Sequence, residues 1–187
     1  MVARARAKPA TYADLEALDP NLVGEIVAGV LYANPRPALP HATAATTLGE
    51  ELGPPFRRGR GGPGGWVFLD EPELHFQSDV VVPDIAGWRR ERLPELPSSA
   101  FLTIAPDWLC EVLSPSTEAI DRGEKLPVYA RERVAHVWLA DPSIRTLEVF
   151  RLDGDTYRLL ATYRDNARAR IEPFDAIELE LTALWTP

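Results

Sequence analysis

Two acidic side chains interrupt apolar stretches that are typical of buried strands. Asp84 lies within Val80–Trp88, and Glu111 lies within Asp107–Leu113. Burying a carboxylate costs free energy unless the group is hydrogen-bonded, paired with a cation or bound to a metal. On neighbouring strands the two acids would converge into an oxygen-rich site suited to a hard cation such as Mg²⁺. The alternative is that each acid meets a backbone amide or one of the chain's many arginines.

The segment after Glu111 supplies a cation. Asp121, Lys125 and Tyr129 follow at spacings of four residues, so on a helix their side chains share one face. Lys8 and Lys125 are the only lysines among 20 basic residues. The scarcity reflects either a codon bias that replaces lysine by arginine or a need for a compact ammonium group at position 125. If the helix covers the end of the Glu111 strand, Lys125 points toward both carboxylates. The alternatives are a surface Asp121–Lys125 ion pair, worth a fraction of a kcal/mol, and simple packing for Tyr129.

Two more polar residues stand at the ends of expected elements. Glu25 begins an apolar run that predicts two short strands around an Ala28-Gly29 turn. It is either a third acid near the metal or a strand-end charge. His41 stands at the expected start of a helix. A neutral imidazole there either caps or packs, or it donates a hydrogen bond to a phosphate.

The elements that must position these residues alternate between strands and helices. This pattern predicts an α/β fold with a mixed central sheet, flanking helices and additional β-hairpins near Trp66–Phe76 and Thr146–Tyr163. We expect residues 1–187 to form one domain, with 1–10 as a loose arm. Pro83 should bulge its strand or place it at a sheet edge, and Pro127 should kink its helix. The expected helices are 12–18, 41–52 and 118–133, and the expected strands are 66–69, 73–76, 80–88, 107–113, 134–140, 146–151, 157–163 and 177–181.

Composition excludes several classes of protein. A single cysteine excludes a disulfide scaffold and a cysteine-based metal site. No apolar run approaches the roughly 20 residues that cross a bilayer, and the basic start lacks the apolar segment of a secretory signal. We therefore expect a cytoplasmic protein without membrane contact. The glycine-rich loop 57–65 lacks the spacing of a phosphate-binding loop, which argues against a nucleotide cofactor.

Charge argues against generic binding of nucleic acid. The chain has 20 basic and 28 acidic residues, for a net charge of −8, whereas affinity for a phosphate backbone comes largely from basic side chains. A nucleic-acid role would need a local basic surface, a bound metal or an oligomer. The candidates to contact backbone phosphates lie in two loops, which are equally compatible with simple solvation; they are Arg57, Arg58, Arg60, Arg89, Arg90 and Arg92.

Several of these motifs together resemble one family. The chain is similar, from about Tyr12 to Arg151, to the Uma-type restriction endonucleases, a bacterial family long catalogued as a domain of unknown function within the PD-(D/E)XK nuclease superfamily. The resemblance implies a restriction-endonuclease-like fold. It rests on Glu25…Gly29, His41, Val82-Pro83-Asp84, Glu111-Val112-Leu113-Ser114-Pro115-Ser116-Thr117, Asp121…Lys125…Tyr129 and Val137-Trp138-Leu139-Ala140-Asp141-Pro142.

The resemblance also implies roles. Asp84, Glu111 and the carbonyl group of Val112 would ligate Mg²⁺ or Mn²⁺, with Glu25 as an auxiliary acid. The superfamily usually places a lysine two residues after the glutamate, where this chain has Leu113. Lys125 on the following helix would replace that lysine. His41, Asp121 and Tyr129 would contact substrate or support the ligands.

These inferences predict a metal-dependent endonuclease that hydrolyses phosphodiester bonds of DNA, acting as a homodimer. Such a site would lower the pKa of a metal-bound water and stabilise charge on the phosphate. The alternative is a nuclease fold that has lost turnover and serves as a binding or assembly module. A third option is hydrolysis of a different phosphate-bearing substrate, because a metal site does not name its substrate.

Overall fold

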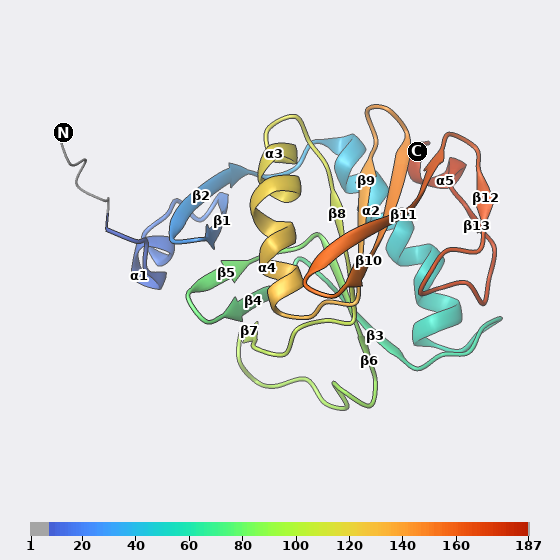
Figure 1. Ribbon diagram of the computed structural model, residues 1–187, viewed down its shortest axis with the longest axis horizontal. Helices are drawn as coiled ribbons and strands as arrows, with labels where there is room; N and C mark the ends of the chain where they lie inside the picture. Colours follow the sequence, from blue (N-terminus) through green and yellow to red (C-terminus); the bar gives the residue numbers. More distant parts are fainter. Residues whose placement is uncertain (1–7, 187) are drawn as a thin grey trace.

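The computed structural model describes residues 8–186. Its strands form two mixed sheets and a short two-stranded pair, with few helices (Figure 1). The five-stranded sheet has the order β2-β1-β5-β4-β7, with bounds β1 Leu22–Val27, β2 Val30–Pro35, β4 Glu73–Phe76, β5 Asp79–Val81 and β7 Phe101–Leu102. The six-stranded sheet has the order β11-β10-β9-β8-β6-β3, with bounds β3 Trp66–Asp70, β6 Ile85–Arg89, β8 Trp108–Val112, β9 His136–Asp141, β10 Thr146–Asp153 and β11 Thr156–Arg164.

The helices are short apart from one. They are α1 Tyr12–Glu16, α2 Leu39–Leu52, the π-helix η1 Gly53–Arg57, α3 Glu118–Ile120, the π-helix η2 Asp121–Lys125, α4 Leu126–Arg131 and α5 Thr182–Trp185. The small pair consists of β12 Arg168–Ala169 and β13 Leu179–Glu180. In the view of Figure 1, α4 lies in front of the strands of the six-stranded sheet, and α2 lies behind that sheet. The expected α/β fold is confirmed, with two sheets in place of one.

The N-terminal hairpin follows the local sequence signals. Ala28 and Gly29 both have positive φ, at 52° and 77°, as a two-residue type I′ turn requires. Thr11 and Asp14 form a capping box at the start of α1. Of the expected N-terminal arm, residues 1–7 lie outside the described residues. Ala10 donates its N–H to the carbonyl of Gly29 at 2.9 Å, so the arm is fixed to the hairpin at this point.

Pro83 divides the stretch that we expected to be one strand. Val80 and Val81 belong to β5 in the five-stranded sheet, whereas β6 begins at Ile85 in the six-stranded sheet. Because proline has no N–H to donate, the ladder cannot continue through it. The chain therefore passes from one sheet to the other here, rather than forming a bulge or an edge, and Asp84 lies in the crossing.

A second expectation needs correction. The stretch Trp66–Phe76 is not a hairpin, because β3 pairs with β6 whereas β4 pairs with β5 and β7. The expected hairpin of Thr146–Tyr163 is present as β10 and β11. Strands β3 and β4 join different sheets, and the alternation of hydrophobic residues does not predict which sheet a strand joins.

Strand β8 is central to the six-stranded sheet. It runs antiparallel to β6 and parallel to β9, and all five of its residues are buried. Because side chains alternate along a strand, Trp108 and Cys110 pack on one face, and Leu109 and Glu111 point to the other. Asp84 and Glu111 lie at the same end of neighbouring strands, since Ile85 pairs with Cys110.

The helix after β8 departs from its expected form. Its irregularity lies at the π-helix η2, upstream of the kink expected at Pro127. Pro127 lacks the N–H that would bond to Gly123, so the α-helical pattern is interrupted over this turn. Single π-turns within helices occur frequently at functional sites. Asp121 and Lys125, which begin and end the turn, are both buried.

Two other segments are more ordered than their composition suggests. Helix α2 begins at Leu39 instead of His41, because proline is tolerated in the first helical turn and Pro40 stands there. The glycine-rich loop 57–65 has its backbone held by hydrogen bonds. Arg60 N–H bonds to the carbonyl of Pro54, and Gly64 N–H bonds to that of Pro55, both at 2.8 Å.

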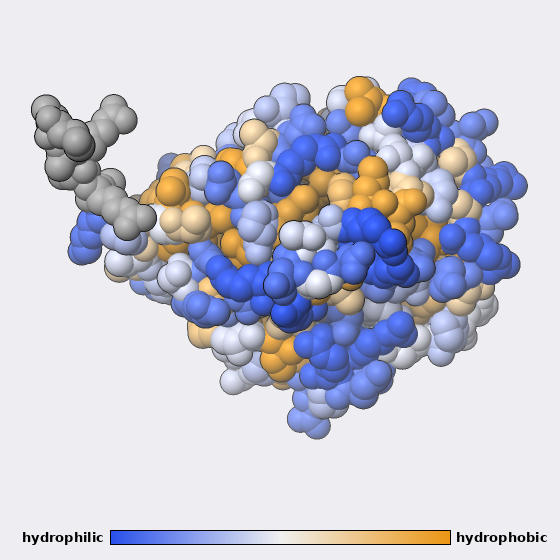
Figure 2. All heavy atoms as spheres, viewed as in Figure 1, coloured by the Kyte–Doolittle hydropathy of each residue, from blue (hydrophilic) through white to orange (hydrophobic). Residues whose placement is uncertain are grey.

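The surface is mainly hydrophilic. In Figure 2 hydrophilic side chains cover most of the visible face, and apolar side chains form smaller areas between them. Over residues 8–186, no helix combines the length and the apolar character needed to span a bilayer.

Candidate active site

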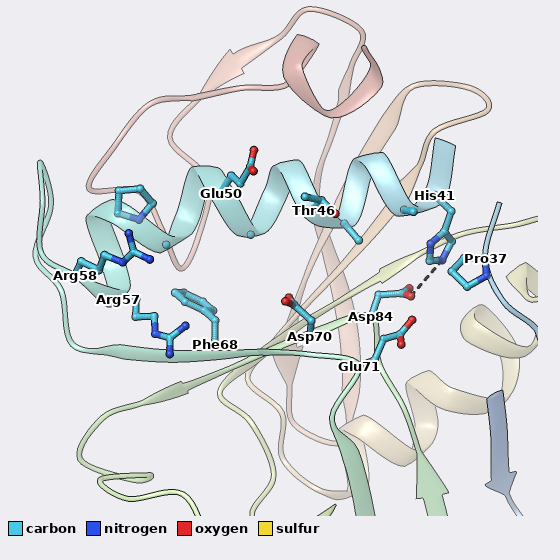
Figure 3. Close-up of a pocket in the computed structure, with 15 residues that line it drawn as sticks. Pro37, His41, Thr46, Glu50, Arg57, Arg58, Phe68, Asp70, Glu71 and Asp84 are labelled. Carbon is cyan, nitrogen blue, oxygen red and sulfur yellow. Dashed lines mark ion pairs between the residues drawn. The ribbon is translucent and has the colours of Figure 1, made fainter. Parts of the chain in front are cut away.

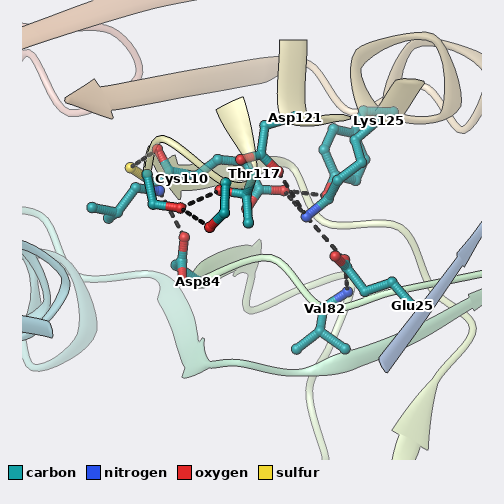
Figure 4. Close-up of polar contacts among 12 residues, drawn as sticks. Glu25, Val82, Asp84, Cys110, Thr117, Asp121 and Lys125 are labelled. Atoms are coloured by element: carbon teal, nitrogen blue, oxygen red, sulfur yellow. Dashed lines mark hydrogen bonds and ion pairs between the residues drawn. The ribbon is translucent and has the colours of Figure 1, made fainter. Parts of the chain in front are cut away.

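A buried lysine lies between carboxylates from different elements (Figure 4). Lys125 Nζ is 2.8 Å from Glu111 Oε1, 2.9 Å from Glu25 Oε1 and 3.2 Å from Asp121 Oδ1. Glu111 comes from β8 of one sheet and Glu25 from β1 of the other. The spacing of Asp121 and Lys125 brings them together across the π-turn. The ion pair between them is thus buried, and the surface alternative is wrong.

Glu25 and Glu111 are each held by a second donor. The N–H of Val82 donates to Glu25 Oε1 at 2.8 Å. The Tyr129 hydroxyl donates to Glu111 Oε1, so Tyr129 does more than pack. Both contacts of Glu111 involve Oε1, which leaves Oε2 as the oxygen available to a ligand.

Asp84 lies beside this cluster and has its own partners. Its Oδ2 accepts the N–H of Val112 at 2.7 Å, and its Oδ1 is 3.2 Å from His41 Nε2. The other imidazole nitrogen, Nδ1, is buried without a hydrogen-bond partner in the described part of the chain. His41 therefore orients Asp84 instead of capping α2. Within residues 8–186, no arginine forms an ion pair with Glu25, Asp84, Glu111 or Asp121.

These residues line one cavity of about 280 Å³. Sequence reasoning missed three of its polar residues. Glu71, Arg36 and Thr117 also line the cavity, and the Thr117 hydroxyl lies 3.0 Å from that of Ser114. The sequence signal for Glu71 was its place in Asp70-Glu71-Pro72 directly after a strand. Thr117 belongs to the Glu111–Thr117 motif that carries the family resemblance, to which we assigned no role beyond Glu111 and Val112.

The electrostatics of the cluster favour retention of protons. Burial raises the pKa of Glu111 well above its usual value, and the nearby carboxylates add to this, while Lys125 opposes it. Burial alone would lower the pKa of Lys125, but the carboxylates of Glu111 and Glu25 hold it well above the ordinary value. Burial likewise raises the pKa of Asp121 and Tyr129. Lys125 is thus a charged ammonium group in an acidic cavity.

The cavity contains oxygen donors of the kind that bind divalent cations. Among residues 8–186, no three His, Cys, Asp or Glu side chains are grouped as metal ligands. Two carboxylates, Asp84 and Glu111, line the same cavity as Val112, and the Val112 carbonyl would provide a third oxygen. Oxygen donors of this kind fit Mg²⁺ or Mn²⁺, and the excess of acids favours a cation.

The predicted DNA-contacting arginines fall into two groups. Arg57 and Arg58 line a second cavity, and Arg60 is exposed in the glycine-rich loop. The second group has intramolecular partners. The Arg89 guanidinium lies 4.1 Å from the Trp66 ring centre, Arg90 donates to backbone carbonyls, and Arg92 pairs with Asp107.

Comparison with known proteins identifies the family. Residues 9–183 match the model of the Uma2 family, whose description is "Putative restriction endonuclease". The chain belongs to the Uma2 family. No curated protein matches it.

A solved structure shares the fold. It is described as "a putative nuclease belonging to DUF820" from Anabaena variabilis ATCC 29413. The two superpose with a TM-score of 0.77 over 95% of this chain and 98% of that one, at 20% sequence identity. At this identity the likeness establishes the fold, and the expected restriction-endonuclease-like architecture is confirmed.

Proposed function

We propose that this Uma2 protein is a metal-dependent endonuclease that hydrolyses phosphodiester bonds of DNA. The observation that carries the proposal is the position of Lys125, whose Nζ lies within 2.9 Å of Glu25 and Glu111 in the cavity that Asp84 also lines. The positive charge of this ammonium group offsets the repulsion between the cavity's carboxylates and an entering phosphate.

The reaction adds water to phosphorus and breaks one P–O ester bond, and the leaving oxygen takes up a proton. A divalent cation held by Asp84, Glu111 and the Val112 carbonyl would lower the pKa of a bound water and neutralise phosphate charge. Lys125 orients the water or stabilises negative charge on the phosphate as a point donor. Glu25 and Asp121 keep the ammonium in position, and His41 fixes the rotamer of Asp84.

The net charge of −8 then has a functional meaning. Without a cation the carboxylates repel a phosphate backbone, so binding and cleavage should both depend on the metal. We further propose a homodimer, in which two sites address the two strands. The β10–β11 hairpin offers a surface for it, because β11 is an edge strand and Leu159 on it is 47% exposed.

A nicking assay tests the proposal. Purified protein should convert supercoiled plasmid to the nicked form with Mg²⁺ or Mn²⁺ and lose this activity with a chelator. Glu111→Ala and Lys125→Ala should each reduce the rate by about 100-fold or more. Glu124→Ala, at an exposed acid next to Lys125, is the matched control and should retain the rate. Nicking that persists in both site variants would exclude the mechanism.

A second candidate is a nuclease fold that binds without turnover. It is favoured by the internal contacts of the acids, since Glu25, Asp84, Glu111 and Asp121 each have a partner within the protein. Calorimetry with Mn²⁺ separates the two functions. The endonuclease should bind Mn²⁺ and lose this binding in Asp84→Ala, whereas the binding module should show no metal affinity and no sensitivity to chelators.

A further inference from the structure

A second cavity, of about 610 Å³, continues from the candidate active site along helix α2. The two cavities share Pro37, His41, Glu71 and Asp84. In Figure 3, α2 forms one wall and the strand that carries Phe68 and Asp70 forms the other. His41 and Asp84 lie at one end of this groove, and Arg57 and Arg58 lie at the opposite end.

The wall formed by α2 has small side chains. Between His41 at one end and Glu50 near the other, the α2 residues that line the groove are Ala42, Ala45, Thr46 and Gly49, and Gly53 of η1 follows them. Ala44, Leu48 and Leu52 of α2 point into the core. A Cβ atom added to Gly49 would meet only Asp70 Oδ1, at 3.8 Å. The space over this wall is therefore open, and a larger side chain at position 49 would fill it.

The opposite wall is rigid and partly aromatic. The Phe68 ring lies parallel to the Trp66 ring at a centroid distance of 5.9 Å and meets Trp108 edge-on at 6.0 Å. Phe68 is only 8% exposed, so it forms a fixed apolar floor. The exposed part of the ring offers an unpaired base a small aromatic contact surface.

Charge is distributed unevenly along the groove. Arg57 and Arg58 are exposed, and neither forms an ion pair with the other residues drawn in Figure 3. The middle carries Asp70 and Glu50, which repel phosphates but accept hydrogen bonds from the amino groups of bases. A second phosphate backbone would be disfavoured beside these acids. The volume also falls in the range of pockets that hold a small ligand, about 300–1,000 Å³, and a duplex would not enter it.

We propose that this groove binds an unpaired nucleic-acid strand that runs from the scissile phosphate at Asp84 to a phosphate held by Arg57 and Arg58. The proposal rests on the proposed function and specifies its substrate class as DNA with a single-stranded segment beside the cleavage point. Bases face the α2 wall and Phe68, and the backbone reaches the cations at the far end.

Fluorescence anisotropy tests the groove directly. Binding is measured with Ca²⁺ in place of Mg²⁺, using a labelled oligothymidylate, a blunt duplex and the same duplex with a single-stranded tail. The strand and the tailed duplex should bind at least about tenfold more tightly than the blunt duplex. Gly49→Leu should weaken binding of the strand by about tenfold or more, because its side chain would fill the space that a base occupies and remove base stacking.

Two variants sharpen the test. Arg57→Ala with Arg58→Ala should weaken binding of the strand and reduce the salt dependence of log K by about 0.7, the contribution of the one phosphate that is no longer neutralised. Glu51→Leu adds the same side chain as Gly49→Leu at an exposed position of α2 outside the groove. It should not weaken binding, because it also removes a negative charge.

The outcomes separate this inference from the proposed function. Equal affinity for the strand and the blunt duplex, or unchanged binding in Gly49→Leu, would overturn the proposal that the groove binds an unpaired strand. This holds even if the protein nicks plasmid. If no nicking occurs but the variants weaken strand binding as expected, the groove remains a binding site and the endonuclease proposal is the one that fails.

Discussion

The two faces of strand β8 carry side chains of opposite kinds, aromatic on one face and ionisable on the other. On one face the Trp108 ring meets the rings of Trp138 and Phe174 at centroid distances of 5.2 and 5.0 Å. On the other face Glu111 contacts Lys125 and Tyr129. Both faces are fully buried, so the difference between them is one of chemistry and not of exposure.

The aromatic face of β8 contributes to the stability of the fold, whereas the acidic face contributes little to it. Each apolar side chain on the aromatic face gains roughly 25 cal/mol for every Å² removed from water. On the acidic face the desolvation of Glu111 and Lys125 offsets much of their mutual attraction, and apolar replacements of such pairs are often neutral or stabilising. Polar groups at a buried position of this kind point to function.

The largest effect on stability is expected on the aromatic face. Phe174→Ala removes a ring that contacts Phe56, Trp66 and Trp108, and should cost about 3–5 kcal/mol of unfolding free energy. Urea denaturation measures this as a lower midpoint at an unchanged slope. Ile144→Ala, at an exposed position in the turn after β9, is the control and should cost far less. A decrease below about 1 kcal/mol for Phe174→Ala would show that this cluster is not a main source of stability.

The next effect concerns the cation of the acidic face. Lys125→Met leaves Glu25, Glu111 and Asp121 without their shared partner, and should cost about 3 kcal/mol. Adding Glu111→Gln to this variant should recover part of that stability, because one buried negative charge disappears. If the double variant were as unstable as the sum of the two single variants, the two groups would not be coupled.

A smaller effect compares two buried tyrosine hydroxyls. Tyr129→Phe removes the hydrogen bond to the Glu111 carboxylate, and Tyr157→Phe removes one to the backbone carbonyl of Val134. Hydrogen bonds to charged groups are worth about 1.5–3 kcal/mol and neutral ones about 1 kcal/mol. Tyr129→Phe should therefore be the more destabilising in thermal or urea unfolding. The reverse order would indicate that Glu111 is neutral when it accepts this bond.

The smallest effect is an increase in stability, expected for Glu111→Gln, and it depends on pH. The folded pKa of Glu111 is raised, so its contribution to stability is complete below the unfolded value of about 4.3 and is lost as pH rises through the folded pKa. Glu111→Gln does not titrate. Relative to wild type, the variant should gain stability as pH increases above about 4.3, as measured by urea unfolding at several pH values. A relative decrease in stability over this window would contradict the raised pKa.

Much of the site was predictable from local sequence. The spacing of Asp121, Lys125 and Tyr129 placed them on one face, and the apolar surroundings of Glu111 predicted a buried strand. Pro83 predicted an interruption at Asp84. Each of these signals depends on residues within a few positions of one another, where backbone geometry is nearly fixed by chain connectivity.

Other features depend on packing between distant segments. The sequence does not encode that β5 and β6 join different sheets, or that His41 reaches Asp84 from α2. The π-turn at Asp121–Lys125 depends on the missing N–H of Pro127 and on the ion pairs that Lys125 forms with buried carboxylates. The groove along α2 follows from which face of the helix packs inward. None of these follows from periodicity alone.

The origin of Glu25 and Glu111 in different sheets has a consequence for the folding chain. Neither sheet alone carries the complete set of side chains, so a nascent or partly unfolded chain has no assembled centre. Detachment of the β1–β2 hairpin would remove Glu25 from Lys125 while leaving β8 paired with its neighbours. For the endonuclease proposed above, hydrolytic competence would then require that both sheets have docked.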